Sequence, residues 1–174
     1  MVDSTISHWG YTIEDDWQTE RNVINTQHLV GTYTIPKSCS VIFVEDKVWL
    51  EGVVNGKVTI AAADVDTAGV ERSMILNNNI TYATATSGLL AIAEEDVLVG
   101  LDVPDTMTLN GIFVAQNGRF GRNHYCTDNC SSAHSGSEAV PGTYTSDVQQ
   151  VSLTVNGTIV SNGREGTKWT SGGT

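Results

Sequence analysis

The sequence predicts an all-β protein that folds as a parallel β-solenoid, and three observations support this prediction. From Val41 onward almost every segment is rich in β-branched residues, with Gly or Asn at the breaks, which is typical of short strands. The alternation of apolar and polar residues continues through Asn-Gly dipeptides instead of reversing there. Two segments of similar sequence, 108–122 and 154–168, hold equivalent Asn-Gly dipeptides 46 residues apart.

The clearest alternation lies in VWLEGVVNGKVTIAAAD, residues 48–64. A two-residue hairpin at Asn55-Gly56 would mix apolar and polar residues on both faces of the sheet. A strand path that continues places the even-numbered residues from Val48 to Ala62 on one face that is entirely apolar or glycine. We therefore predict a corner at Asn55-Gly56, because glycine has no Cβ to crowd a tight bend.

The same alternation predicts the inward-facing residues of two later segments. They are Met107, Leu109, Gly111, Phe113 and Ala115 in one, and Val151, Leu153, Val155, Gly157 and Ile159 in the other. Strand–glycine units that cannot bury an apolar face alone indicate stacking, and 46 residues would then be about two turns. The alternative fold is an antiparallel β-sandwich with Asn-Gly hairpins.

The chain is expected to have two parts. Residues 1–40 are polar and predict an irregular lead-in that caps one end of the core. Residues 41–174 form the β-solenoid domain. No amphipathic helical pattern is present in the sequence.

The charge balance is acidic, with nine Lys and Arg against twenty Asp and Glu, and this excludes a basic nucleic-acid-binding protein. No apolar run is long enough to cross a bilayer, so this fragment is not expected to insert into a membrane. The start of the chain has neither the basic nor the apolar region of a signal peptide. We expect either a cytosolic protein or, in better agreement with the sequence, a piece of a larger exported one.

Three cysteines are present, and two of them lie close together in Cys126-Thr-Asp-Asn-Cys130. Cys126 and Cys130 are a candidate disulfide in an oxidising compartment, which leaves Cys39 unpaired. Free thiols are the alternative. A zinc site with His124 and His134 is a weaker one, since the spacing differs from that of known zinc sites.

No residue pattern selects a catalytic site. The densest acidic stretch, Glu94-Glu95-Asp96 followed by Asp102 and Asp105, predicts a solvated turn, although carboxylates are ligands that Ca²⁺ prefers. No cofactor is predicted otherwise. Polysaccharide lyases and hydrolases need carboxylates or basic residues beside a sugar bond. The outward residues considered for such a role are Glu51, Lys57, Asp102, Arg119 and Arg122. A second acidic pair, Asp64 and Asp66, is predicted to form a solvated turn in the same way as the first acidic stretch.

Aromatic side chains give one candidate binding surface. Trp49, Phe120, Tyr125 and Trp169 are candidates for a sugar-binding platform, and a structural stacking role is the alternative for Phe120 and Trp169. The run Asn77-Asn78-Asn79 predicts either an asparagine ladder or a turn.

Several stretches resemble a family of uncharacterised bacterial envelope proteins, described as PilX-like or pilus-assembly-associated. They are VIFVEDKVWLEGVVNGKVTIAAAD, ILNNNITYA, LLAIAEEDVLVGLDVPDTMTLNGIFVAQNGRFGRNHY and SLTVNGTIVSNGREGTKWTSGG, which together cover most of residues 40–173. The resemblance implies an extracytoplasmic, right-handed β-helix with no known catalytic residues. It also implies a pilin-like or membrane segment before this region.

The sequence therefore predicts a non-enzymatic structural or interaction module of a bacterial cell-surface or pilus-associated protein. Its expected partners are other subunits of a surface assembly, or further copies of itself joined end to end, as in a filament-forming solenoid. The alternative function is a β-helix that binds or processes carbohydrate.

Overall fold

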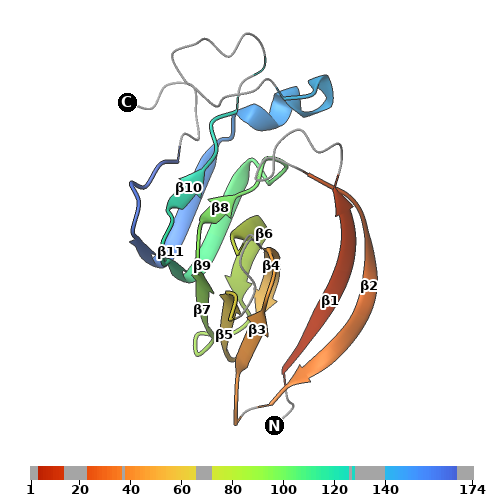
Figure 1. The fold of residues 1–174 in the computed structure, drawn as a ribbon, viewed down its shortest axis with the longest axis vertical. Helices are drawn as coiled ribbons and strands as arrows, with labels where there is room; N and C mark the ends of the chain where they lie inside the picture. Colours follow the sequence, from red (N-terminus) through yellow and green to blue (C-terminus); the bar gives the residue numbers. More distant parts are fainter. Residues whose placement is uncertain are drawn as a thin grey trace.

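The computed structural model describes residues 4–13, 23–36, 38–65, 72–125, 127 and 140–167 (Figure 1). Strands dominate these residues, and the one helical element among them is short. The elements are β1 (Ser4–Ile13), β2 (Ile24–Ile35), β3 (Val41–Val44), β4 (Val48–Val54), β5 (Lys57–Ala62), β6 (Met74–Tyr82), β7 (Gly88–Ala93), β8 (Val97–Val99), β9 (Thr106–Ala115), β10 (Phe120–Arg122), the 3₁₀ helix η1 (Gly142–Val148) and β11 (Ser152–Ser161).

The strands β3–β11 form a nine-stranded sheet in which every pairing is parallel. The protein is therefore all-β with a many-stranded parallel sheet, as predicted. The antiparallel β-sandwich that the sequence left open is wrong, because a sandwich built from hairpins would pair successive strands in opposite directions. Among the described strands from β3 to β11, no two that follow each other in the chain pair with each other.

The parallel pairings fall into three series, which we call A, B and C. Series A joins β3, β5, β7 and the C-terminal halves of β9 and β11. Series B joins the N-terminal halves of β4 and β6 to β8 and β10. Series C joins the C-terminal halves of β4 and β6 to the N-terminal halves of β9 and β11. Each of the long strands β4, β6, β9 and β11 thus takes part in two series.

The prediction for Asn55-Gly56 is confirmed. β4 pairs with β6, and β5 pairs with β3 and β7, so the dipeptide does not close a hairpin. Gly56 has φ 97°, a conformation that side chains with a Cβ rarely adopt, which explains the glycine at this corner. The even-numbered residues point inward as predicted: Ile60 and Ala62 are buried, and Val48 and Val54 pack against the same core.

The two similar segments lie directly against each other. β9 and β11 pair in register from Ser152 with Thr106 to Ser161 with Ala115. Asn156 donates a hydrogen bond from Nδ2 to Oδ1 of Asn110, at a distance of 2.9 Å and a separation of 46 residues. The expectation that 46 residues make two turns is wrong, because β9 and β11 are directly hydrogen-bonded neighbours in the sheet. The separation falls to 45 residues at Asn162 and Asn117, where the second segment lacks one residue.

The main core contains the inward residues of the middle strands, and most of them are fully buried. Met107, Leu109, Phe113 and Ala115 have at most 1% of their surface exposed, as the alternation predicted. Val151 was predicted to point inward but is 68% exposed, because the chain enters β11 only at the next residue. The inward residues of the first and last strands are only partly buried: Ile42, Val48, Leu50, Val54, Leu153, Val155 and Ile159.

Residues 1–40 are more regular than predicted. β1 and β2 pair antiparallel over most of their length and form a separate two-stranded sheet. Figure 1 shows this long hairpin beyond β3 and β4, at one end of the parallel sheet. The strands were missed because apolar residues alternate only over a short part of β2, and Leu29, Val30 and Tyr33 are about half exposed there. The predicted role as a cap stays a prediction.

Candidate functional site

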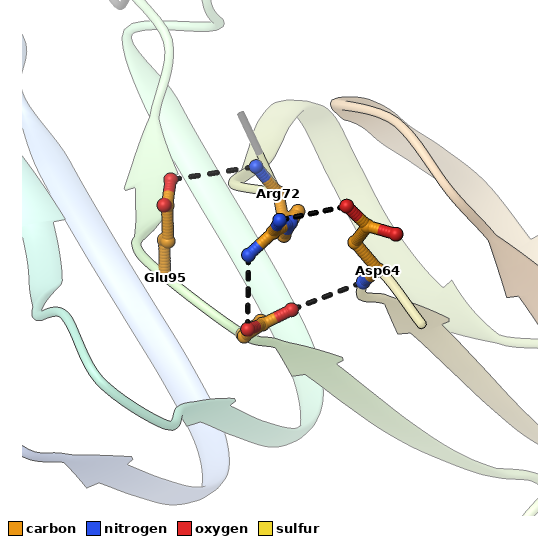
Figure 2. Close-up of polar contacts among 4 residues, drawn as sticks. Asp64, Arg72 and Glu95 are labelled. Atoms are coloured by element: carbon orange, nitrogen blue, oxygen red, sulfur yellow. Dashed lines mark hydrogen bonds and ion pairs between the residues drawn. The ribbon is translucent and has the colours of Figure 1, made fainter. Parts of the chain in front are cut away.

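The predicted acidic stretch lies at a corner between β7 and β8 and is bound by neighbouring groups of the chain (Figure 2). Arg72 donates to Oδ2 of Asp64 at 2.7 Å and to Oε1 of Glu94 at 3.0 Å. The Asp64 side chain is 2% exposed, so its charge depends on this guanidinium rather than on water. Although partial burial lowers it, the net pKa of Arg72 is raised by the hydrogen bond to Asp64 and the charges of Glu94, Asp64 and Glu95.

The three carboxylates at this corner also accept backbone N–H groups from adjoining segments. Glu94 Oε2 accepts the N–H of Asp64 at 3.0 Å, and Glu95 Oε2 accepts that of Arg72 at 3.4 Å. Asp96 Oδ1 accepts the N–H of Arg119 at 2.6 Å. The acidic stretch therefore joins successive corners of the sheet, and a solvated turn describes it incompletely.

Calcium was the metal considered for these carboxylates. Within the described ranges, no three His, Cys, Asp or Glu side chains come together in a way that would hold a metal ion. Asp66, the other member of the second acidic pair, lies outside the described residues. Calcium binding stays the alternative to a solvated turn for the Glu94–Asp96 stretch.

Arg122 is the most heavily hydrogen-bonded charged side chain in the second, smaller core. Its guanidinium donates to four carbonyl oxygens: Gly100 at 3.3 Å, Leu101 at 3.2 Å, Asp147 at 2.6 Å and Val148 at 3.0 Å. It also lies 4.7 Å from the centroid of the Tyr125 ring, which favours a cation–π contact. Burial lowers the pKa of Arg122, while Tyr125 and Asp147 act in the opposite direction.

Arg122 thereby fixes η1 to the loop that follows β8. The surrounding apolar residues Val23, Leu101 and Val140 are buried, and Tyr144 and Val148 of η1 pack against them. Sequence reasoning treated Arg122 as an outward residue, and this is wrong because the side chain is 4% exposed. Arg119 is half-buried, and its Nη2 donates to Oδ1 of Asn123 at 2.5 Å.

A groove of about 490 Å³ lies between the start of β2, the middle of β4 and β6, and the loop before β9. It brings together two of the predicted outward carboxylates, Glu51 and Asp102, whereas Lys57 and Arg119 do not line it. Asn77 donates from Nδ2 to Oε2 of Glu51 at 2.8 Å, which orients that carboxylate. The full lining is Val23, Ile24, Gln27, Glu51, Asn77, Asn78, Asp102, Val103 and Pro104.

The run Asn77-Asn78-Asn79 stands where β6 passes from series B to series C. Asn79 accepts the N–H of Thr108 at 2.7 Å, and Asn78 accepts that of Asn79 at the same distance. The run is therefore neither an isolated turn nor an asparagine ladder. The asparagine pair that does stack is Asn110 with Asn156.

Asp102, which lines the groove, has a shifted pKa. Its pKa is raised, first by desolvation and then by the charge of Asp147, so the folded protein disfavours the ionised form. A carboxyl whose pKa is higher in the folded state destabilises the protein above that pKa, and this penalty disappears as the pH falls below its unfolded value.

We therefore expect Asp102→Asn to raise the midpoint of thermal unfolding at pH 7. The gain should shrink as the pH is lowered through the folded-state pKa, and vanish below the ordinary value of 3.8. Melting curves of both proteins across this range check the prediction. Asp105→Asn is a matched control, because Asp105 lies on the same loop but does not line the groove. Equal gains for both variants at neutral pH would contradict the assignment to Asp102.

The predicted aromatic platform is not formed by the residues that the structure describes. Phe120 and Tyr125 are 2% and 5% exposed, so neither presents a ring to a ligand. Phe120 packs against Phe113 with ring centroids 6.0 Å apart, which agrees with the alternative of a structural stacking role. Trp49 is half-buried in β4, and Trp169 lies outside the described residues.

The proposed disulfide lies outside the described part of the chain, since neither Cys126 nor Cys130 belongs to it. Cys39 is exposed and is a free thiol. His134 also lies outside the described residues, so the zinc site with His124 and His134 stays an alternative prediction.

The sequence predicted neither the groove nor the buried site in which Arg122 binds four carbonyl oxygens. Both depend on side chains that are distant in sequence and are brought together by strand stacking. A signal for Arg122 was present, because an arginine within an apolar strand such as FGR requires acceptors when it is buried. Nothing in the sequence indicated that backbone carbonyls would supply them.

Comparison with protein-family models, with curated proteins and with solved structures found no match to this chain. Among the described residues, no helix has the length and apolar character needed to cross a membrane.

Proposed function

We propose that β3–β11 wind as one right-handed parallel β-solenoid. The order in which the chain visits the pairing series supports this proposal. It passes from β3 in series A to β4 in series B and then C, and β5 and β6 repeat the order A, B, C. β7, β8 and the first half of β9 repeat the order A, B, C. The second half of β9, β10 and the first half of β11 repeat it once more. A chain that returns to each series in the same order advances as a coil.

The function that we propose for this coil is a non-enzymatic structural or interaction module of a bacterial cell-surface, pilus-associated protein. The observation that carries the proposal is that charged side chains of the parallel sheet bind other groups of the same chain. Arg72, Glu94 and Arg122 all bind other parts of the same chain. A rod stabilised in this way suits a spacer that holds partner subunits at a fixed distance. The extracytoplasmic location that the sequence resemblance implied is part of this proposal.

Surface exposure in the bacterium that encodes the chain tests this function. We expect an antibody against the folded domain to label intact cells, and external protease to remove the label without lysis. Labelling seen only after permeabilisation would contradict the extracytoplasmic proposal. A glycan-cleavage assay with purified protein tests the other half of the proposal, because polysaccharide turnover would contradict a non-enzymatic role.

Carbohydrate binding is the second candidate function, and the polar groove favours it. Amide and carboxylate side chains such as Asn77, Asn78 and Glu51 donate and accept the hydrogen bonds that sugar hydroxyls make. A glycan array provides the test. Selective binding that is lost in Asn78→Ala but retained in Trp49→Ala would place the sugar in the groove. Loss in Trp49→Ala alone would point to an aromatic surface instead, and no binding would reject this candidate.

A further inference from the structure

The two ends of the parallel sheet carry open edges that belong to the same pairing series. Within the part of the chain that the structure describes, β3 pairs with β5 alone and β11 pairs with β9 alone. β3 therefore begins series A, and the second half of β11 ends it. An edge strand presents unpaired N–H and C=O groups that serve as a template for another strand.

Neither edge strand contains the charged residues or prolines that natural proteins use to prevent pairing. Charged residues, prolines and short length are the usual protection of an edge strand. β11 is ten residues long, and its sequence SLTVNGTIVS contains no charge and no proline. β3 is only four residues long, but its sequence VIFV is uncharged and contains no proline. Both edges are thus suited to pairing with another strand.

The apolar core is also open at both ends. In series A, strand register places Ile42 beside Ile60, Ile60 beside Ala91, Ala91 beside Phe113 and Phe113 beside Ile159; this column runs the length of the sheet. Ala91 and Phe113 in its middle are 0% exposed, and Ile60 is 5% exposed. Ile42 and Ile159 at its ends are only partly buried. A strand added at either end would complete this burial.

We propose that a second copy of this chain occupies the open edge, with its β3 paired parallel to β11 of the first copy. This contact depends on the solenoid proposed above, and it identifies the partner subunit of that solenoid as a second copy of the same chain. The same register would set the second copy's Ile42 beside Ile159 and continue the column. It would also set the second copy's Val41 beside Thr158 and its Phe43 beside Val160 on the outer face.

The β1–β2 hairpin forms its own two-stranded sheet and adds no strand to the β3 edge among the described residues. It lies beyond β3 and β4 in Figure 1, and the outward side chains of Val41 and Phe43 are 56% and 49% exposed. Neither of its strands pairs with β3 or β4 among the described residues. A heterologous contact of this kind leaves one free edge at each end of the pair, so it extends to longer filaments.

Sedimentation velocity on the purified 174-residue chain over increasing concentration tests the proposal. We expect the wild type to form larger species as the concentration rises. The double variant Val41→Lys with Thr158→Lys places two like charges side by side, and should weaken association by about tenfold or more. Val41→Asp combined with Thr158→Lys should restore it, because the two charges then attract. Ile112→Lys, at an outward and 44% exposed position on an inner strand, should leave association unchanged.

Three results would overturn the proposal. The first is a wild type that stays monomeric at millimolar concentration. The second is association abolished by Thr158→Lys with no rescue by Val41→Asp, which indicates pairing of two β11 strands. The third is association equally weakened by Ile112→Lys. Unchanged circular dichroism and thermal melting of each variant would show that the interface alone had failed, and the single-chain solenoid would stand.

Discussion

Replacing Arg122 by methionine should destabilise the protein more than any other single charge removal among the described residues. Methionine keeps much of the volume but leaves the carbonyls of Gly100, Leu101, Asp147 and Val148 without their donor in a buried site. Losing charged hydrogen bonds to buried acceptors costs about 3 kcal/mol. For a chain of this size that corresponds to a drop in Tm of roughly 6–12 °C.

Thermal unfolding followed by circular dichroism measures the change, and Arg164→Met is the matched control. Arg164 is exposed, so its replacement should shift Tm by no more than about 1–2 °C. Hydrogen exchange adds a local readout. Amides of residues 100–103 and 142–150 should exchange faster in Arg122→Met, since η1 loses its attachment. Equal melting of both variants would contradict the role assigned to Arg122.

Replacing Gly157 by alanine should prevent β11 from packing in its present register. A Cβ at this position would overlap the carbonyl oxygen of Gly111, which belongs to the neighbouring strand. Gly157 also has φ 155°, at the edge of the region that favours glycine. Overpacking against backbone forces the strand to move, at a cost of about 3 kcal/mol. Urea unfolding, analysed for both midpoint and slope, measures this cost.

Gly88→Ala is the control for this substitution. Gly88 begins β7 in the same series, and the nearest atom to its added Cβ would be Lys57 Cγ at 3.9 Å, an ordinary contact. We expect a change within about 0.5 kcal/mol for this variant. A Gly157→Ala protein as stable as Gly88→Ala would show that β9 and β11 are not packed as closely as described.

The strand path was predictable because burial constrains alternation. Inward residues such as Ile60, Leu109 and Phe113 keep their phase across each glycine, and this phase is visible in the sequence. The corner at Asn55-Gly56 followed from the same constraint. The structural role of Phe120 was one of two readings that the sequence left open.

The parts that could not be predicted depend on contacts between distant segments. The number of residues between Asn110 and Asn156 does not show whether their two strands are direct neighbours in the sheet. The 46-residue separation is large because η1 and its flanking segments come between β10 and β11 along the chain. The groove has the same origin, since Gln27, Glu51 and Asp102 come from three separate segments. β2 escaped detection because residues on both of its faces are exposed.

Cross-linking between β9 and β11 tests whether the coil exists in solution. In a chain whose cysteines at 39, 126 and 130 are replaced by serine, Asn110→Cys and Asn156→Cys place two thiols on adjacent parallel strands. Neighbouring strands are about 4.8 Å apart, within the Cα range of about 4.4–6.8 Å that disulfides span. Pairing Asn110→Cys with Val160→Cys instead separates the thiols by roughly 13 Å along the strand.

We predict that mild oxidation cross-links the variant carrying Asn110→Cys and Asn156→Cys within one chain, rapidly and completely. The variant carrying Asn110→Cys and Val160→Cys should stay reduced under the same conditions. Peptide mapping after digestion identifies the bond, and urea-unfolded protein gives the background rate. Failure of the first pair to cross-link in folded protein, or equal cross-linking of both pairs, would contradict the in-register parallel stacking on which the proposed solenoid depends.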